Sequence, residues 1–126
     1  MTLKRVRVTV IDSGVAQPWG DNLGHGTACA ALISAVCEEV VISSIVIVDD
    51  SGRGSVQALV AAIERAVAEG TGVINISLGH TRAVHPETSP LARACRQAAE
   101  AGVIIVAAGH NDGLVSYPAH LPTVIG

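Results

Sequence analysis

The chain has 126 residues, of which 49% are hydrophobic and 15% charged, and its formal net charge at pH 7 is −3. This length suits a single domain spanning residues 1–126, and the small negative charge argues against a nucleic-acid-binding surface. No apolar run reaches the roughly 18 residues that a membrane helix needs, and the basic N-terminus leads into no signal-peptide core. Neither a nucleic acid nor a membrane is therefore an expected partner.

Strands and helices are predicted to alternate along the chain. In order, we expect a strand over 5–12, a helix over 27–37, a strand over 40–50, a helix over 55–69, a strand over 72–78, a helix over 89–101 and a strand over 102–109. The first helix is apolar over residues 28–33 and is expected to be buried. The second stops at Gly70. The third has Ser89 as N-cap, Pro90 at its first position and Gly102 past its end.

Apolar strands separated by helices predict a three-layer α/β fold, in which a parallel sheet carries helices on both faces. Polar residues cluster where the strands end, at the edge where such sheets carry function. The clusters are Asp12, Gly52–Ser55, Ser77–His80 and His110–Asp112. His25 opens the first helix between two glycines. An aspartate beside a histidine orients its imidazole and stabilises its charged form, so Asp12 and His25 are expected to lie together at this edge.

The three cysteines are odd in number and lack the spacing of a metal site. Cys29, Cys37 and Cys95 are therefore expected to be buried free thiols in a reducing compartment, which indicates a cytoplasmic location. Cys29 lies one turn after His25 and is interpreted as a buried thiol rather than half of a Cys–His pair. His80 is interpreted as a surface loop residue. No metal and no cofactor are expected.

Six segments resemble, in order, the N-terminal part of the catalytic domain of the subtilisin-like serine proteases. They are VTVIDSGV, DNLGHGTACA, SSIVIVDDSGRGS, GVINISLGH, GVIIVAAGHNDG and SYPAHLPTVIG. The resemblance covers nearly the whole chain and keeps that family's order of aspartate before histidine. It implies a subtilisin-like fold in which Asp12 and His25 are the catalytic aspartate and histidine.

The resemblance also implies a cleft for an extended peptide or protein substrate, which would pair as an added strand. The two walls would be formed by Gly52, Arg53 and Gly54 on one side and by Ser77, Leu78 and Gly79 on the other. The oxyanion donor has two candidates, because the family pattern Ala-Ala-Gly-Asn corresponds here to AAGHN over residues 107–111. Either His110 replaces the asparagine, or Asn111 acts after one inserted residue.

The chain departs from the family most clearly at the nucleophile, because the Gly-Thr-Ser segment that carries it is absent. We therefore expect a truncated domain, incomplete at its C-terminus. Asp12 and His25 are so close in the sequence that the family's usual intervening hairpin is missing. The first helix runs almost directly into the second strand, which leaves no room for the calcium-binding loop of many subtilisins. A truncated sheet edge and bare apolar surface predict a homo-oligomer or a second chain that covers the edge.

Two functions remain open. The first is a portion of a serine endopeptidase that cleaves extended peptides only if a serine-bearing segment is supplied. The alternative is a catalytically inactive module, a pseudoenzyme that binds a peptide or a partner protein. Purely structural interpretations also remain: Asp12 as a turn cap, His25 as a helix-start residue, and Gly52–Gly54 as a strand-to-helix turn. The glycine-rich turn has neither G-x-G-x-x-G nor a Walker lysine, so a nucleotide site is not expected.

Overall fold

The computed structural model describes residues 5–12, 25–47, 54–110 and 112–126, and for residues 25–27 it describes the main chain only. Within these ranges, strands and helices alternate as predicted. They are β1 (Val6–Asp12), α1 (His25–Val36), β2 (Val40–Val46), α2 (Val56–Ala68), β3 (Val73–Ile76), α3 (Pro90–Glu100), β4 (Ile104–Ala107) and β5 (Val124–Ile125). No helix in the described ranges is long and apolar enough to cross a membrane.

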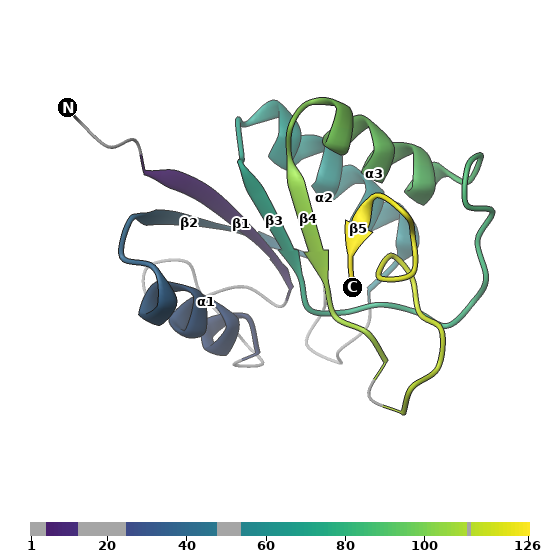
Figure 1. Ribbon diagram of the computed structural model, residues 1–126, viewed down its shortest axis with the longest axis horizontal. Coiled ribbons are helices and arrows are strands. Elements are labelled where there is room, and N and C mark those ends of the chain that lie inside the picture. The colour runs from purple at the N-terminus through teal and green to yellow at the C-terminus, as the bar shows by residue number, and fades with distance from the viewer. Residues whose placement is uncertain (1–4, 13–24, 48–53, 111) are drawn as a thin grey trace.

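The five strands form one parallel sheet in the order β2-β1-β3-β4-β5 (Figure 1). β1 is an interior strand that pairs with β2 along its whole length, up to Asp12 opposite Val46. Helix α1 lies on one face of the sheet, and α2 and α3 lie side by side on the other (Figure 1). The predicted three-layer α/β fold is confirmed.

Two cores of unequal size lie on the two faces of the sheet. Side chains alternate along a strand, so Ile11 packs with the α2–α3 layer while its neighbour Val10 packs under α1. The larger core joins all five strands to α2 and α3 through Ile45, Ile74, Ile76, Ile105, Val124, Leu59, Ile63, Leu91, Cys95 and their neighbours. Among the residues that the structure describes, the smaller core has three buried members, Val10, Ala30 and Ile42.

Local signals position the helices of the larger core as predicted. The Ser89 hydroxyl oxygen accepts a hydrogen bond from the main-chain N–H of Ala92 at 3.1 Å, which satisfies one of the orphan donors at the start of α3. Pro90 takes the first turn, where a missing N–H costs nothing. Gly70 and Gly102 follow α2 and α3 with φ of 83° and 82°, a backbone conformation that favours glycine.

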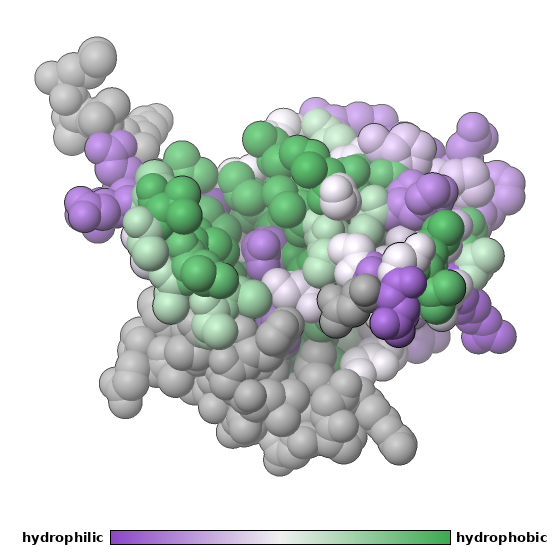
Figure 2. Space-filling model, turned by 60° about the horizontal axis from the view of Figure 1, so that its bottom comes forward, coloured by the Kyte–Doolittle hydropathy of each residue, from purple (hydrophilic) through white to green (hydrophobic). Residues whose placement is uncertain are grey.

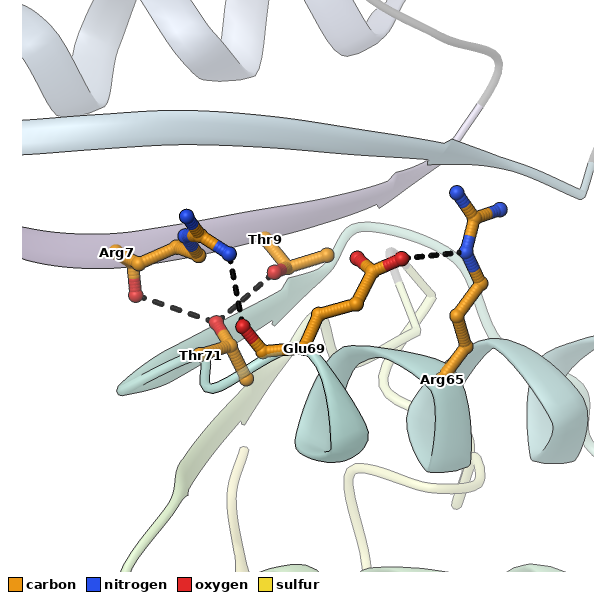
Figure 3. Close-up of polar contacts among 5 residues, drawn as sticks. All are labelled: Arg7, Thr9, Arg65, Glu69 and Thr71. Atoms are coloured by element: carbon orange, nitrogen blue, oxygen red, sulfur yellow. Dashed lines mark hydrogen bonds and ion pairs between the residues drawn. The ribbon is translucent and has the colours of Figure 1, made fainter.

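A network of hydrogen bonds ties the amino end of the sheet to the end of α2 (Figure 3). The buried Thr9 hydroxyl donates to the Thr71 hydroxyl oxygen at 2.9 Å, and the Thr71 hydroxyl lies 3.2 Å from the carbonyl oxygen of Arg7. The Arg7 guanidinium donates to the carbonyl oxygen of Glu69 at 2.8 Å, while the Glu69 carboxylate pairs with Arg65. These contacts fix the amino end, opposite the edge where the predicted site lies.

Candidate active site

The site is assembled at the carboxyl edge of the sheet, because parallel strands all end there. β1 ends at Asp12, which is buried and contacts a partner group within the protein. β3 continues into Ser77 and β4 into His110. Helix α1 begins at His25, two residues before the start at residue 27 that the sequence pattern predicted. The side chain of His25 lies outside the described residues, so its contact with Asp12 stays a prediction.

The first turns of α1 are anchored to the end of β3. The Cys29 sulfur lies 3.0 Å from the Ser77 hydroxyl oxygen, and the Asn75 side-chain amide donates to the same oxygen at 2.9 Å. His25 occupies the position one helical turn before Cys29. The contact thus holds the start of α1 beside the same strand ends that carry the other predicted site residues. Sequence reasoning missed this contact, because its partners are 48 positions apart.

A cavity of about 470 Å³ opens at this edge. Its walls bring together residues from α1, from the loop after β3, and from the loops that follow β4. They are Cys29, Ser77, Leu78, Gly79, Ala108, Gly109, His110, Asp112 and Ser116. Three predicted cleft residues and one candidate oxyanion donor therefore share one hollow. The other candidate donor, Asn111, lies outside the described residues.

The geometry of His110 defines which of its nitrogens can donate. Its Nδ1 accepts a hydrogen bond from the main-chain N–H of Asp112 at 3.1 Å. A neutral imidazole carries one proton, and a nitrogen that accepts cannot hold it. The proton is therefore assigned to Nε2, which makes that nitrogen a donor. Because His110 lines the cavity, such a donor suits a site where negative charge develops.

A second pocket of about 150 Å³ lies between the start of α2 and the loop after β3. Gly54 stands on one side of it, and Leu78 and Gly79 on the other; Gly52 and Arg53 lie outside the described residues. The remaining lining residues are Ile47, Ser55, Val56, Leu59 and His80. Described members of both predicted cleft segments thus line one hollow.

The loop after β3 is held against the segment around Tyr117. His80 and Tyr117 exchange two main-chain hydrogen bonds, of 3.1 and 2.8 Å. A Cβ at Gly79 would lie 2.9 Å from the Tyr117 carbonyl oxygen, so only glycine fits there without a shift of the backbone. His80 is half-buried and its Nε2 is fully enclosed. The interpretation of His80 as a surface loop residue was therefore wrong, because this pairing draws its ring inward.

The cysteines differ from one another more than expected. Cys95 is buried in the larger core, and burial raises the pKa of its thiol to about 11. Cys29 is half-buried in the cavity wall, whereas Cys37, just after α1, is exposed. The prediction of three buried thiols was therefore wrong for Cys37. No cluster of three or more His, Cys, Asp or Glu residues that could hold a metal occurs in the part of the chain that the structure describes.

Comparisons with known proteins relate the chain to one family. Residues 8–126 match the sequence profile of the subtilase family. The minor extracellular protease Epr of Bacillus subtilis (strain 168) is 30% identical over 99% of this chain and 23% of its own length, and subtilisin E of the same organism is 27% identical over 98% and 40%. Each relative is thus much longer than the region it shares with this chain.

Solved structures give the same result. The prenylagaramide maturation protease PagA superposes with a TM-score of 0.81 at 28% identity, covering 97% of this chain and 52% of its own. A lanthipeptide protease superposes with a TM-score of 0.80 at 26% identity, covering 94% and 46%. The chain therefore spans about half the length of these structures and less of the two sequence relatives.

Proposed function

Since this chain belongs to the subtilase family, we propose that it carries the aspartate–histidine half and the substrate cleft of a serine endopeptidase site. It cleaves extended peptides when a segment that bears the nucleophilic serine is supplied. The observation that carries this proposal is the position of Asp12, at the carboxyl end of β1, beside the edge where α1 starts at His25 and the larger cavity opens. The chain itself has no Gly-Thr-Ser segment.

In this mechanism, His25 is the general base. It takes the proton from the supplied serine hydroxyl as that oxygen attacks the peptide carbonyl, and it later returns the proton to the leaving amine. Asp12 orients the imidazole and stabilises its positive charge. Burial of Asp12 supports this role, because charge interactions are stronger where water is excluded.

The tetrahedral intermediate needs hydrogen-bond donors for its oxyanion. His110 is favoured over Asn111 in this role, because its Nδ1 is already engaged and its Nε2 is left as the donor. Removal of one such donor typically lowers the rate by about 10²–10³. Comparison of His110→Ala with Asn111→Ala in the completed enzyme identifies the donor: the larger loss of kcat marks it.

The substrate is an extended peptide that lies between Gly54 and the segment Ser77–Gly79. Main-chain groups along such a groove pair with the substrate as an added strand. The smaller pocket is lined mainly by apolar side chains, among them Ile47, Leu59 and Leu78, and accommodates one apolar side chain of the peptide. The larger cavity lies next to the catalytic edge and holds the residue at the scissile bond.

One observation favours the alternative, an inactive peptide-binding module. Two described serines line the larger cavity, and neither is placed as a nucleophile. The Ser77 hydroxyl is held by Cys29 and Asn75, and the Ser116 hydroxyl oxygen is fully enclosed. The chain without a supplied serine therefore binds peptide without acyl transfer.

The test joins the chain to the serine-bearing C-terminal part of a subtilase and measures cleavage of an unstructured peptide. We expect His25→Ala and Asp12→Asn each to lower kcat by at least about 10³. His85→Ala is the matched control: His85 lies in an exposed loop, and its loss should leave kcat unchanged. If the joined protein binds the peptide but never cleaves it, or if both site variants cleave at the parent rate, the inactive module is the better description.

A further inference from the structure

A short chain of hydrogen bonds links helix α1 to the end of β3. The Asn75 side-chain amide donates to the Ser77 hydroxyl oxygen at 2.9 Å, and the Cys29 sulfur lies 3.0 Å from the same oxygen. A hydroxyl offers one donor and two acceptor positions, so Ser77 can take part in both contacts. The bond from Asn75 restrains this oxygen against β3, so Cys29 contacts a fixed point at the end of the strand.

That fixed point lies beside the strand end that carries Asp12. β1 and β3 are parallel neighbours, and their register pairs Ile11 with Ile76. Asp12 and Ser77 each follow this pair by one residue, so they lie side by side at the carboxyl edge of the sheet. A contact between α1 and Ser77 therefore restrains the helix relative to Asp12 as well as to β3.

The packing of α1 on the sheet is apolar. The helix, HGTACAALISAV, has no Asp, Glu, Lys or Arg, and Figure 2 shows hydrophobic atoms gathered over α1 on the left and over the strands beside it. Ala30 and Ile33 pack in the smaller core. Apolar contacts have no preferred direction, whereas a hydrogen bond weakens steeply when its geometry changes. The contact of Cys29 with Ser77 therefore sets the rotation and the axial position of α1 more sharply than the apolar packing does.

The positions of His25 and Cys29 lie on one face of α1. They are four residues apart, which is about one helical turn, and positions at that spacing share a side of the helix. The face that meets Ser77 at Cys29 is therefore the face that carries His25. A rotation or a shift of α1 would move both positions together, so a link at Cys29 also restrains His25.

We propose that Cys29 is a positioning residue for the general base of the proposed site. Through Ser77, it holds the start of α1 at the place where His25 meets Asp12. This inference rests on the proposed function, because the position of His25 affects a rate only if His25 acts as the base. The role needs the hydrogen bond of Cys29 and not the reactivity of its thiol, so serine can replace Cys29 and alanine cannot.

Peptide cleavage by the joined protein, in which a serine-bearing C-terminal part completes the chain, tests this role. We expect Cys29→Ala to lower kcat about tenfold with KM changed less than about twofold, because a slightly misplaced base slows the chemical step. Cys29→Ser should recover most of the loss, because a hydroxyl keeps the hydrogen bond. Ile33→Val is the matched control. It trims apolar packing on the same helix without touching the link, so it should lower stability and leave kcat unchanged.

A double-variant cycle tests whether Ser77 is the partner through which Cys29 acts. Ser77→Ala should lower kcat by a similar factor. The double variant Cys29→Ala with Ser77→Ala should lose no more than the larger single loss, because both substitutions break one link. Additive losses, a Cys29→Ala variant that cleaves at the parent rate, or an Ile33→Val variant that loses as much kcat would overturn the proposal.

A measurement that needs no cleavage separates this inference from the proposed function. NMR records the histidine ring signals of the 126-residue chain, and the signal of His25 is identified by its loss in His25→Ala. We expect Cys29→Ala to move this signal toward its position in the urea-unfolded chain, whereas Cys29→Ser and Ile33→Val leave it near its parent position. If the joined protein never cleaves, the proposed function fails, and the spectrum still decides whether Cys29 positions His25. A His25 signal that stays at its parent position in Cys29→Ala would contradict the inference.

Discussion

The two faces of the sheet differ in how completely they are covered, although the same strands form both. On the α2–α3 face, the strand residues from β1 to β5 join one continuous core. On the α1 face, three described residues form a small buried core, and Ile104, Val106 and Ile125 remain exposed. Apolar side chains therefore occur on both faces, and the faces differ in what packs on them. In the single strand β4, Ile105 is buried on the α2–α3 face, whereas its neighbour Ile104 is half-exposed on the α1 face.

The largest expected effect on the free energy of unfolding comes from substitutions in that strand. Ile105→Ala should lower the free energy of unfolding by about 3 kcal/mol, because it removes buried methyl groups and leaves a cavity in the larger core. Ile104→Ala, the same change on the half-exposed side, should cost less than about 1 kcal/mol in dilute chain. Urea titration at a protein concentration below 1 µM would measure both. Equal losses would mean that the two faces are equally packed.

The coarse fold was predictable because its signals are local. Apolar runs gave the strands, and Ser89, Pro90 and the glycines after α2 and α3 gave helix ends that the structure confirms. Burial of α1 was expected from its apolar run, yet Leu32 is exposed. A sequence pattern reports that a segment prefers an apolar environment. It does not report whether the residues packed around that segment supply that environment.

The second effect is a loss of stability at high pH that is caused by a buried cysteine thiol. Burial raises the pKa of Cys95 in α3 from 9.0 to about 11. Between these values the unfolded thiol loses its proton while the folded thiol keeps it, so stability falls as pH rises and is unaffected by this group below about pH 9. The loss from pH 9 to 11 should be about 2 kcal/mol, since each pKa unit is worth 1.36 kcal/mol and each thiol is half titrated at its own pKa.

Two variants isolate that contribution. Cys95→Ala should remove most of the extra loss of stability above pH 9. Cys37→Ala should not change that loss, because Cys37 is exposed just after α1. Urea titrations at pH 8, 9, 10 and 11 in a reducing buffer would measure the difference between parent and variant at each pH. A parent and a Cys95→Ala variant that lose stability in parallel would show that the thiol titrates normally.

The third effect concerns the buried hydrogen bond between Thr9 and Thr71 on the α2–α3 face of the sheet. The Thr71 hydroxyl lies 3.0 Å from the Val73 carbonyl oxygen and accepts from buried Thr9. Thr71→Val should therefore cost about 2 kcal/mol, because it leaves the Thr9 hydroxyl buried without an acceptor. The double variant with Thr9→Val should recover part of this loss. Thr123→Val, in an exposed turn, is the control and should change stability by less than about 0.5 kcal/mol.

The candidate site was predictable in its strand ends but not in its long-range contacts. Topology alone places Asp12, Ser77 and His110 at one edge, because parallel strands end together. Nothing in the sequence pairs Cys29 with Ser77, or His80 with Tyr117, since these contacts depend on how loops pack across the edge. The engagement of Nδ1 in His110 likewise follows from the turn into Asp112 and from no spacing rule.

The smallest expected effect compares a serine on each side of the sheet. Ser89 caps α3 by accepting the Ala92 N–H, so Ser89→Ala should lower the free energy of unfolding by about 1 kcal/mol. Ser34 lies exposed within α1, where alanine is the better helix former, so Ser34→Ala should be neutral or stabilising by up to about 0.5 kcal/mol. Both are measured by urea titration below 1 µM, where association is weak. A loss of about 1 kcal/mol in Ser34→Ala would mean that the exposed side of α1 makes stabilising polar contacts.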